Sequence, residues 1–204
     1  MLMPPLLQAF NNTLVPYLDA LFNIYEAMDR AYNLAAAHYG FKCAGCDDNC
    51  CYTRFYHYTY IEYGYLLKGY RLLDEHKSVE VRKKALKVIG DSQAANKKES
   101  AGRHMCPLNF DGRCILYSHR PMICRLHGIP HQFQTPGHKG IYAPGCETFT
   151  GQHGDAEYFN FDRTPFYTQM ARLEGELKQA MGVGDKLKMT IADMITTFLS
   201  DSQK

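Results

Sequence analysis

The feature that most constrains this chain is the grouping of its eight cysteines into two clusters. A C-x2-C turn lets two thiolates converge on one metal ion or cluster, and such turns recur in zinc and iron–sulfur sites. Four cysteines within nine residues, followed by four more, predict metal or redox chemistry. All eight are candidate metal ligands: Cys43, Cys46, Cys50, Cys51, Cys106, Cys114, Cys124 and Cys146.

The N-terminal region lacks the pattern of a secretory signal. Its apolar residues are interrupted by Gln8, Asn11 and Asp19 before the first basic residue, Arg30. We therefore expect a cytoplasmic protein, in which thiols stay reduced and clustered cysteines favour metal sites over structural disulfides. No apolar run approaches the roughly 18 residues that a membrane span needs, so no membrane association is expected.

Chain length and net charge indicate how many domains to expect and which partners are not expected. A chain of 204 residues is expected to form a single domain over 1–204. Its 23 basic and 21 acidic side chains leave a net charge of +2. This balance provides no strong field for gathering phosphates, so nucleic acid is not an expected partner.

Apolar residues at intervals of three or four predict helices before and between the cysteine clusters. The pattern predicts a short helix over 5–14 and a longer helix that starts near Pro16 and stops at Gly40. Thr59 and Glu62 have the spacing of a capping box, so another helix is expected to begin at Thr59.

Further helices are expected later in the chain. Ser78 is expected to cap a helix that runs to about Ser100. Thr164, followed by a proline, has the pattern of a helix start, and Gly182 is expected to end that helix. A last amphipathic helix is expected from about Thr190.

The two cysteine segments, 41–58 and 103–146, have no helical period. Within the second segment, Asp111 and Gly112 predict a tight turn, and Pro121 predicts the start of a short helix. Both segments contain too little apolar material to fold unaided, so we expect them to fold around metal.

Together these patterns predict a mostly α-helical domain with two irregular cysteine-rich metal-binding loops. The cysteine-cluster metal-binding region spans 43–146. It is flanked by N-terminal helices over about 5–40 and by C-terminal helices over about 164–200.

Eight cysteines divide into two sets of four, the number that closes a tetrahedral zinc site or one [4Fe–4S] cluster. One four-cysteine centre with additional packed, reactive or paired thiols is the alternative. Adjacent side chains on an extended backbone point to opposite sides, so Cys50 and Cys51 are expected to diverge. Cys43 and Cys46 are expected to share one centre with at least one cysteine of the second segment.

Other residue types near the cysteines have candidate supporting roles. Arginines are expected to offset the negative charge of a thiolate site by hydrogen bonding to sulfur or backbone: Arg54, Arg113, Arg120 and Arg125. The aromatic run after Cys51 provides rings that shield a metal centre from water, although packing against helices is the better interpretation for any one ring. For His57, His104 and His119, a surface or packing role is favoured over ligation.

The cysteine pattern, together with the stretch CPLNFDGRCILYSHRPMICR that starts at Cys106, resembles the YkgJ-type cysteine-cluster family of zinc- or iron-chelating domains. The resemblance covers about residues 43–146, with one extra residue between Cys46 and Cys50. It implies bound zinc or iron. It also implies a relationship to the domain of flagellin lysine N-methylases, which transfer methyl groups from S-adenosylmethionine and are associated with an iron–sulfur cluster.

The favoured hypothesis is therefore a protein that holds an iron–sulfur cluster, of the [4Fe–4S] type, for a redox, electron-transfer or enzymatic role with a protein or redox partner. A structural zinc module that forms an interaction surface is the alternative. Methylation with S-adenosylmethionine is a lesser alternative, implied by the resemblance alone. The sequence contains neither G-x-G-x-x-G nor G-x-x-x-x-G-K-[ST], which excludes the usual nucleotide-binding motifs.

Overall fold

The structure is a computed structural model that describes residues 12–43, 50–97, 103–134, 137 and 139–202. It is mostly helical, as predicted. The expected helix over 5–14 lies largely outside the described residues. No helix in the described part of the chain combines the length and the apolarity that a membrane span requires.

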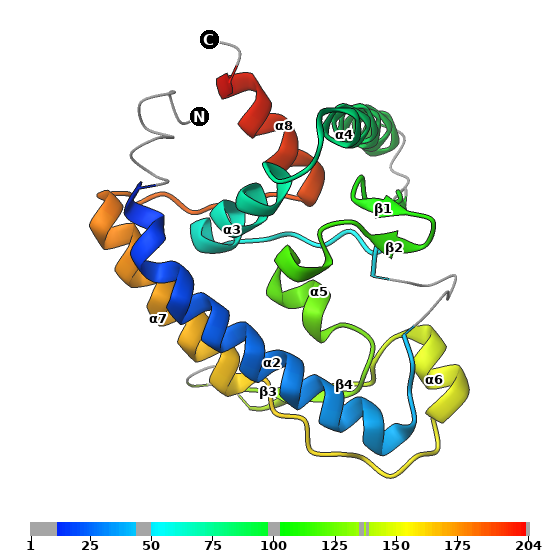
Figure 1. The fold of residues 1–204 in the computed structure, drawn as a ribbon. Helices are drawn as coiled ribbons and strands as arrows, with labels where there is room; N and C mark the ends of the chain where they lie inside the picture. The colour runs from blue at the N-terminus through cyan, green and yellow to red at the C-terminus, as the bar shows by residue number, and fades with distance from the viewer. Residues whose placement is uncertain (1–11, 44–49, 98–102, 135–136, 138, 203–204) are drawn as a thin grey trace.

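Two long helices lie side by side along one edge of the molecule (Figure 1). They are α2 (Leu18–Tyr39), which follows a 3₁₀ turn at Val15–Tyr17, and α7 (Thr164–Met181). Each ends at a left-handed glycine, Gly40 with φ 64° and Gly182 with φ 66°, which confirms both predicted stops.

The start of α7 differs in detail from the prediction. Thr164 is the first helical residue and does not act as the cap. The Asp162 carboxylate accepts hydrogen bonds from the Thr164 N–H (2.8 Å) and hydroxyl (2.6 Å). The Asp162 carboxylate is a stronger hydrogen-bond acceptor than a hydroxyl, and it binds the first N–H of this helix.

Helix α3 (Tyr60–Tyr70) begins after Thr59, as the capping box predicts. The Thr59 side chain accepts from the Glu62 N–H. This short helix is buried on most of its surface and contacts α2, α7 and α8 (Ile191–Ser202). It forms the centre of the fold, because residues on several of its faces are covered by neighbouring elements.

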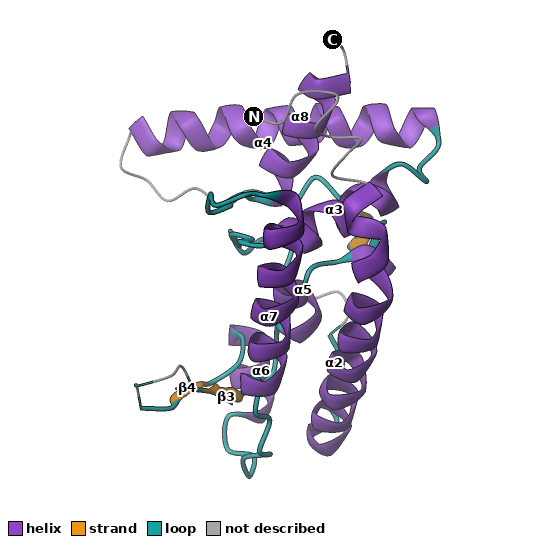
Figure 2. Cartoon of the chain, turned by 90° about the vertical axis from the view of Figure 1, so that its left-hand side faces the viewer, coloured by secondary structure: helices purple, strands orange, loops and turns teal. Residues whose placement is uncertain are grey.

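Helix α4 (Glu75–Lys97) lies across the end of this group and packs against α8 (Figure 2). The prediction that Ser78 caps this helix is wrong. Asp74 accepts a hydrogen bond from the Lys77 N–H at 2.8 Å, so the helix begins one turn earlier. Ser78 instead donates its hydroxyl to the Glu75 carbonyl inside the first turn.

The segment 103–146 contains more regular structure than its sequence predicts. Strands β1 (Asn109–Phe110) and β2 (Arg113–Cys114) form a hairpin around Asp111 and Gly112, both at positive φ, so the expected tight turn is confirmed. Pro121 precedes the short helix α5 (Met122–Leu126), also as predicted.

Other elements in and after this segment have no counterpart in the prediction. A second antiparallel hairpin pairs β3 (His131–Phe133) with β4 (Ile141–Ala143). Helix α6 (Glu147–His153) directly follows Cys146. These elements are too short to produce a recognisable period in the sequence.

A single apolar cluster connects the helices with the second cysteine segment. Leu108, Leu116, Leu126 and Ile129, all from this segment, are buried together with helical residues such as Leu66. At roughly 25 cal/mol per Å² of apolar surface, such burial contributes substantially to folding. Packing against helices thus contributes to the ordering of this segment.

Candidate metal centre

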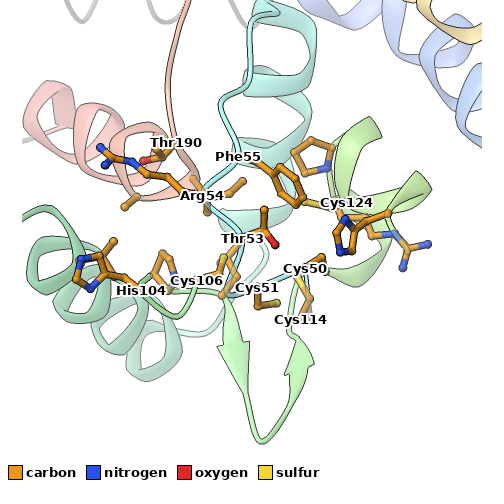
Figure 3. A pocket seen from close by; sticks show the side chains of 18 of the residues that line it. Cys50, Cys51, Thr53, Arg54, Phe55, His104, Cys106, Cys114, Cys124 and Thr190 are labelled. Carbon is orange, nitrogen blue, oxygen red and sulfur yellow. The ribbon is translucent and has the colours of Figure 1, made fainter. Parts of the chain in front are cut away.

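Six thiols line one cavity, and five of them, from four separate pieces of backbone, are labelled in Figure 3. Cys50 and Cys51 lie in a turn before α3, Cys106 precedes β1, Cys114 ends β2, and Cys124 lies in α5. The β1–β2 hairpin and α5 bring the second segment's thiols to the turn that carries the first segment's thiols. The two cysteine clusters therefore meet in space, although more than 50 residues separate them along the chain.

The expectation that Cys50 and Cys51 diverge is wrong. Both residues lie in a hydrogen-bonded turn, where the Thr53 N–H donates to the Cys50 carbonyl at 3.3 Å. Adjacent side chains alternate only on an extended backbone. In this turn the two thiols lie close enough to hydrogen bond to each other, and both line the cavity.

Cys51 is the electrostatic centre of the group. Hydrogen bonds from the thiols of Cys106 and Cys50 hold the pKa of the Cys51 thiol well below its usual value. The same contacts raise the pKa values of Cys50 and Cys106, because each thiol donates a hydrogen bond to the Cys51 sulfur and is held in its protonated form. Within this cluster, Cys51 is therefore the thiol that loses its proton most readily.

Cys114 and Cys124 complete the group. Burial raises the pKa of Cys114 to about 11, and burial also raises the pKa of Cys124, with a contribution from Cys114 nearby. As neutral thiols these two side chains suit a partly buried wall. As thiolates, these two side chains need a nearby cation to balance their negative charge. A metal ion bound by both sulfurs provides that charge.

The remaining three cysteines are arranged differently. Cys43 is exposed and lines the edge of the cavity. Cys46 lies outside the described residues. Cys146 is buried and does not line the cavity, and its sulfur accepts a hydrogen bond from the Phe149 N–H at 3.4 Å, at the start of α6.

A network of buried charges positions α5, and with it Cys124. The Glu62 carboxylate, in α3, accepts hydrogen bonds from the Met122 N–H (2.7 Å), the Tyr25 hydroxyl (3.3 Å) and the Thr59 hydroxyl (2.6 Å). Glu62 is 5% exposed, so these bonds replace water that the carboxylate has lost.

Arg125 fixes the other side of α5. Its guanidinium donates to Asp29 (2.6 Å) and to the carbonyls of Ser118 (2.5 Å) and Arg120 (3.0 Å), and it stacks over the Tyr25 ring at 4.0 Å. Because Asp29 and Tyr25 belong to α2, this arginine ties α5 to the long helix.

The predicted supporting residues have mixed outcomes. Arg125 and Arg120 bind backbone or Asp29, and the structure gives no hydrogen bond from either to sulfur among the described residues. Phe55 lines the cavity and packs edge-on against His127 at 5.4 Å, which agrees with a shielding role. His119 stacks on Tyr65 at 4.7 Å, the packing role that the sequence favoured.

The cavity has a volume of about 920 Å³. Its six sulfur donors match the soft ligands that zinc and iron–sulfur clusters require. In the described part of the chain, however, no three Cys, His, Asp or Glu side chains converge at the geometry of a metal-ion site. The donor chemistry fits a metal centre, and binding requires the thiols to turn from one another toward a shared ion or cluster.

Comparison with known proteins found no matching family model, no matching curated protein and no matching solved structure. The residues of the site therefore carry the functional argument.

The sequence did not identify two residues of this site. Glu62 was expected only as part of a capping box, yet its carboxylate also binds the first N–H of α5. Asp29 had no predicted role, yet it pairs with Arg120 and Arg125. Both contacts span 60 residues or more, and no local pattern encodes a contact over that separation.

Proposed function

We propose that this chain binds an iron–sulfur cluster through its clustered cysteines, and that the cluster serves a redox, electron-transfer or enzymatic role. The observation that carries the proposal is the convergence of six thiols from two distant segments on one cavity. Four thiolates are sufficient to hold a [4Fe–4S] cluster. The sequence resemblance to the YkgJ-type family, whose name implies bound zinc or iron, supports the same conclusion.

A cysteine thiol must lose its proton when its sulfur binds a metal, because the thiolate is the ligand. Cys51 is the thiol whose pKa is lowered, first by the hydrogen bond from Cys106 and then by that from Cys50, so it loses its proton most readily. We therefore assign Cys51 as the first ligand, with Cys106, Cys114 and Cys124 following as the metal displaces their protons. Arg120 lowers the energy of the Cys114 and Cys124 thiolates through its positive charge.

A structural zinc module remains the second candidate, because a Cys₄ set suits Zn²⁺ equally well. The cavity of about 920 Å³ has room for either group, because it extends beyond the thiols. The relationship to flagellin lysine N-methylases that the resemblance implies is what favours the iron–sulfur candidate.

Anaerobic purification followed by iron, inorganic sulfide and zinc analysis tests the proposal. We expect iron and sulfide in similar amounts, with a brown sample that bleaches in air. Zinc at one or more equivalents in a colourless sample would establish the structural module instead. Neither metal above trace, in folded protein that has never met oxygen or chelator, would refute both candidates.

Paired serine variants test which thiols bind. Cys106→Ser should lose most of the metal, because Cys106 hydrogen bonds to Cys51 inside the cavity. Cys146→Ser makes the same chemical change at a thiol outside the cavity, and serine is a strong helix cap, so metal content and α6 should be retained. Equal loss in the two variants would show that Cys146 belongs to the centre.

A further inference from the structure

The cavity extends well beyond its thiols. In Figure 3, Cys50, Cys114 and Cys124 lie at one end, whereas His104, Arg54 and Thr190 lie at the other, near α4 and α8. A volume of about 920 Å³ is in the range of pockets that hold organic ligands, roughly 300–1,000 Å³. The end near α4 and α8 therefore provides space that a metal centre at the thiol end does not use.

The wall near α4 and α8 is largely apolar. Val88 and Ile89 of α4, Ile191 and Ala192 of α8, and Leu108 line it. Ala192 and Leu108 are each 2% exposed, so this wall belongs to the packed core. Such a surface favours the carbon skeleton of a ligand over bulk water.

Two imidazoles on the wall have ring nitrogens that lack partners. His57 is 2% exposed, and neither its Nε2 atom nor that of His104 has a hydrogen-bond partner among the described residues. Both residues line the cavity. A buried polar atom without a partner costs about 1–3 kcal/mol, and in native proteins such atoms usually bind a ligand or an ordered water.

The charged residues that line this end are Arg54, which is exposed, and Asp193. Arg54 lines the cavity, and its only described contact is with the Tyr56 ring, at 5.5 Å from the ring centre. The nearby carboxylate of Asp193 is already occupied, because it accepts hydrogen bonds from the N–H (2.9 Å) and hydroxyl (2.7 Å) of Thr190. A guanidinium without an acidic partner binds carboxylates through its planar donors.

We propose that this cavity binds a small organic carboxylate, with the carboxylate group at Arg54 and His104 and the apolar body along the α4–α8 wall. His57 then provides a hydrogen bond to a polar atom of the ligand between the two ends. This arrangement places the ligand at the end of the cavity away from Cys50, Cys114 and Cys124. The site itself is formed by protein side chains, so ligand binding does not depend on which metal the thiols hold.

Octanoate is a suitable probe, because it combines a carboxylate with an unbranched apolar body. Its binding to the full, metal-loaded chain is measured by calorimetry, with octanol and inorganic phosphate as comparison probes. We expect saturable binding of one octanoate per chain. Octanol, which lacks the charge, and phosphate, which lacks the body, should each bind at least tenfold more weakly.

Two variants with the same change in net charge locate the site. Arg54→Gln should weaken octanoate binding by about tenfold or more, because it removes a charge-assisted hydrogen bond. Arg30→Gln is the control, since Arg30 is an exposed α2 residue whose partner is Glu26. His104→Gln keeps a polar side chain at its position and should weaken binding without altering the fold.

The outcomes separate this proposal from the metal proposal. Octanoate binding that survives Arg54→Gln, or that falls equally in Arg30→Gln, would overturn the carboxylate site. Phosphate binding as tightly as octanoate would overturn it as well, since the apolar wall would then contribute nothing. A chain that binds octanoate as expected but contains no iron or zinc would refute only the metal centre.

Discussion

Glu62 offers the sharpest test of how the fold positions the thiols. Its carboxylate binds the Met122 N–H, the Tyr25 hydroxyl and the Thr59 hydroxyl. Glu62→Ala leaves two of these donors, on Met122 and Tyr25, without a partner in a buried region. At about 1–3 kcal/mol for each donor, the variant should lose about 2–6 kcal/mol of its free energy of unfolding.

Glu174 provides a matched control. This carboxylate, in α7, is 8% exposed and accepts hydrogen bonds from the N–H groups of Tyr60 (2.9 Å) and Ile61 (3.1 Å), at the start of α3. Glu174→Ala therefore also leaves two buried donors without partners, and its cost in stability should be similar. The described contacts of Glu174 do not include α5, so only the Glu62 variant should disturb Cys124.

Urea unfolding measures the stability of both variants, and alkylation of metal-free, reduced protein under native conditions measures access to each thiol. We expect Glu62→Ala to increase the alkylation rate of Cys124 by tenfold or more, which corresponds to about 1.4 kcal/mol of local opening. Glu174→Ala should leave that rate within twofold of the parent protein. Equal rates in the two variants would refute the conclusion that Glu62 holds α5 in place.

Three other predictions concern packing, pH and metal removal. Gly69→Ala should destabilise the fold by about 1–3 kcal/mol, because the added carbon would lie 2.4 Å from the His119 ring, whereas Gly90→Ala in open space should stabilise α4 by up to about 1 kcal/mol in thermal unfolding. Burial lowers the His131 pKa to about 4, so the unfolded chain takes up this proton first as the pH falls. Stability should decrease between about pH 6.5 and 4, and His131→Asn should show a shallower decrease in urea titrations. Chelation under reducing conditions should remove hydrogen-exchange protection from the two cysteine segments while α2 and α7 keep theirs, and unchanged protection in the segments would mean that apolar packing alone orders them.

Local patterns were sufficient to predict much of the helical framework. The stops at Gly40 and Gly182, the start at Thr59, the turn at Asp111 and the entry at Pro121 all follow from the conformational preferences of single residues or of close neighbours. Such preferences act within a few residues, so they can be recognised without knowing the fold.

Only the tertiary structure decided how the cysteines are grouped. The turn at Cys50 and Cys51 places both thiols on one cavity, and Cys106 joins them because its N–H donates to the Cys51 carbonyl at 2.8 Å. Cys146 belongs to the same cysteine-rich segment, but it lies at the start of α6, outside the cavity. Spacing along a chain limits which residues can meet, but the actual contacts depend on long-range packing and on carboxylates such as Glu62, whose partners lie far away in the sequence.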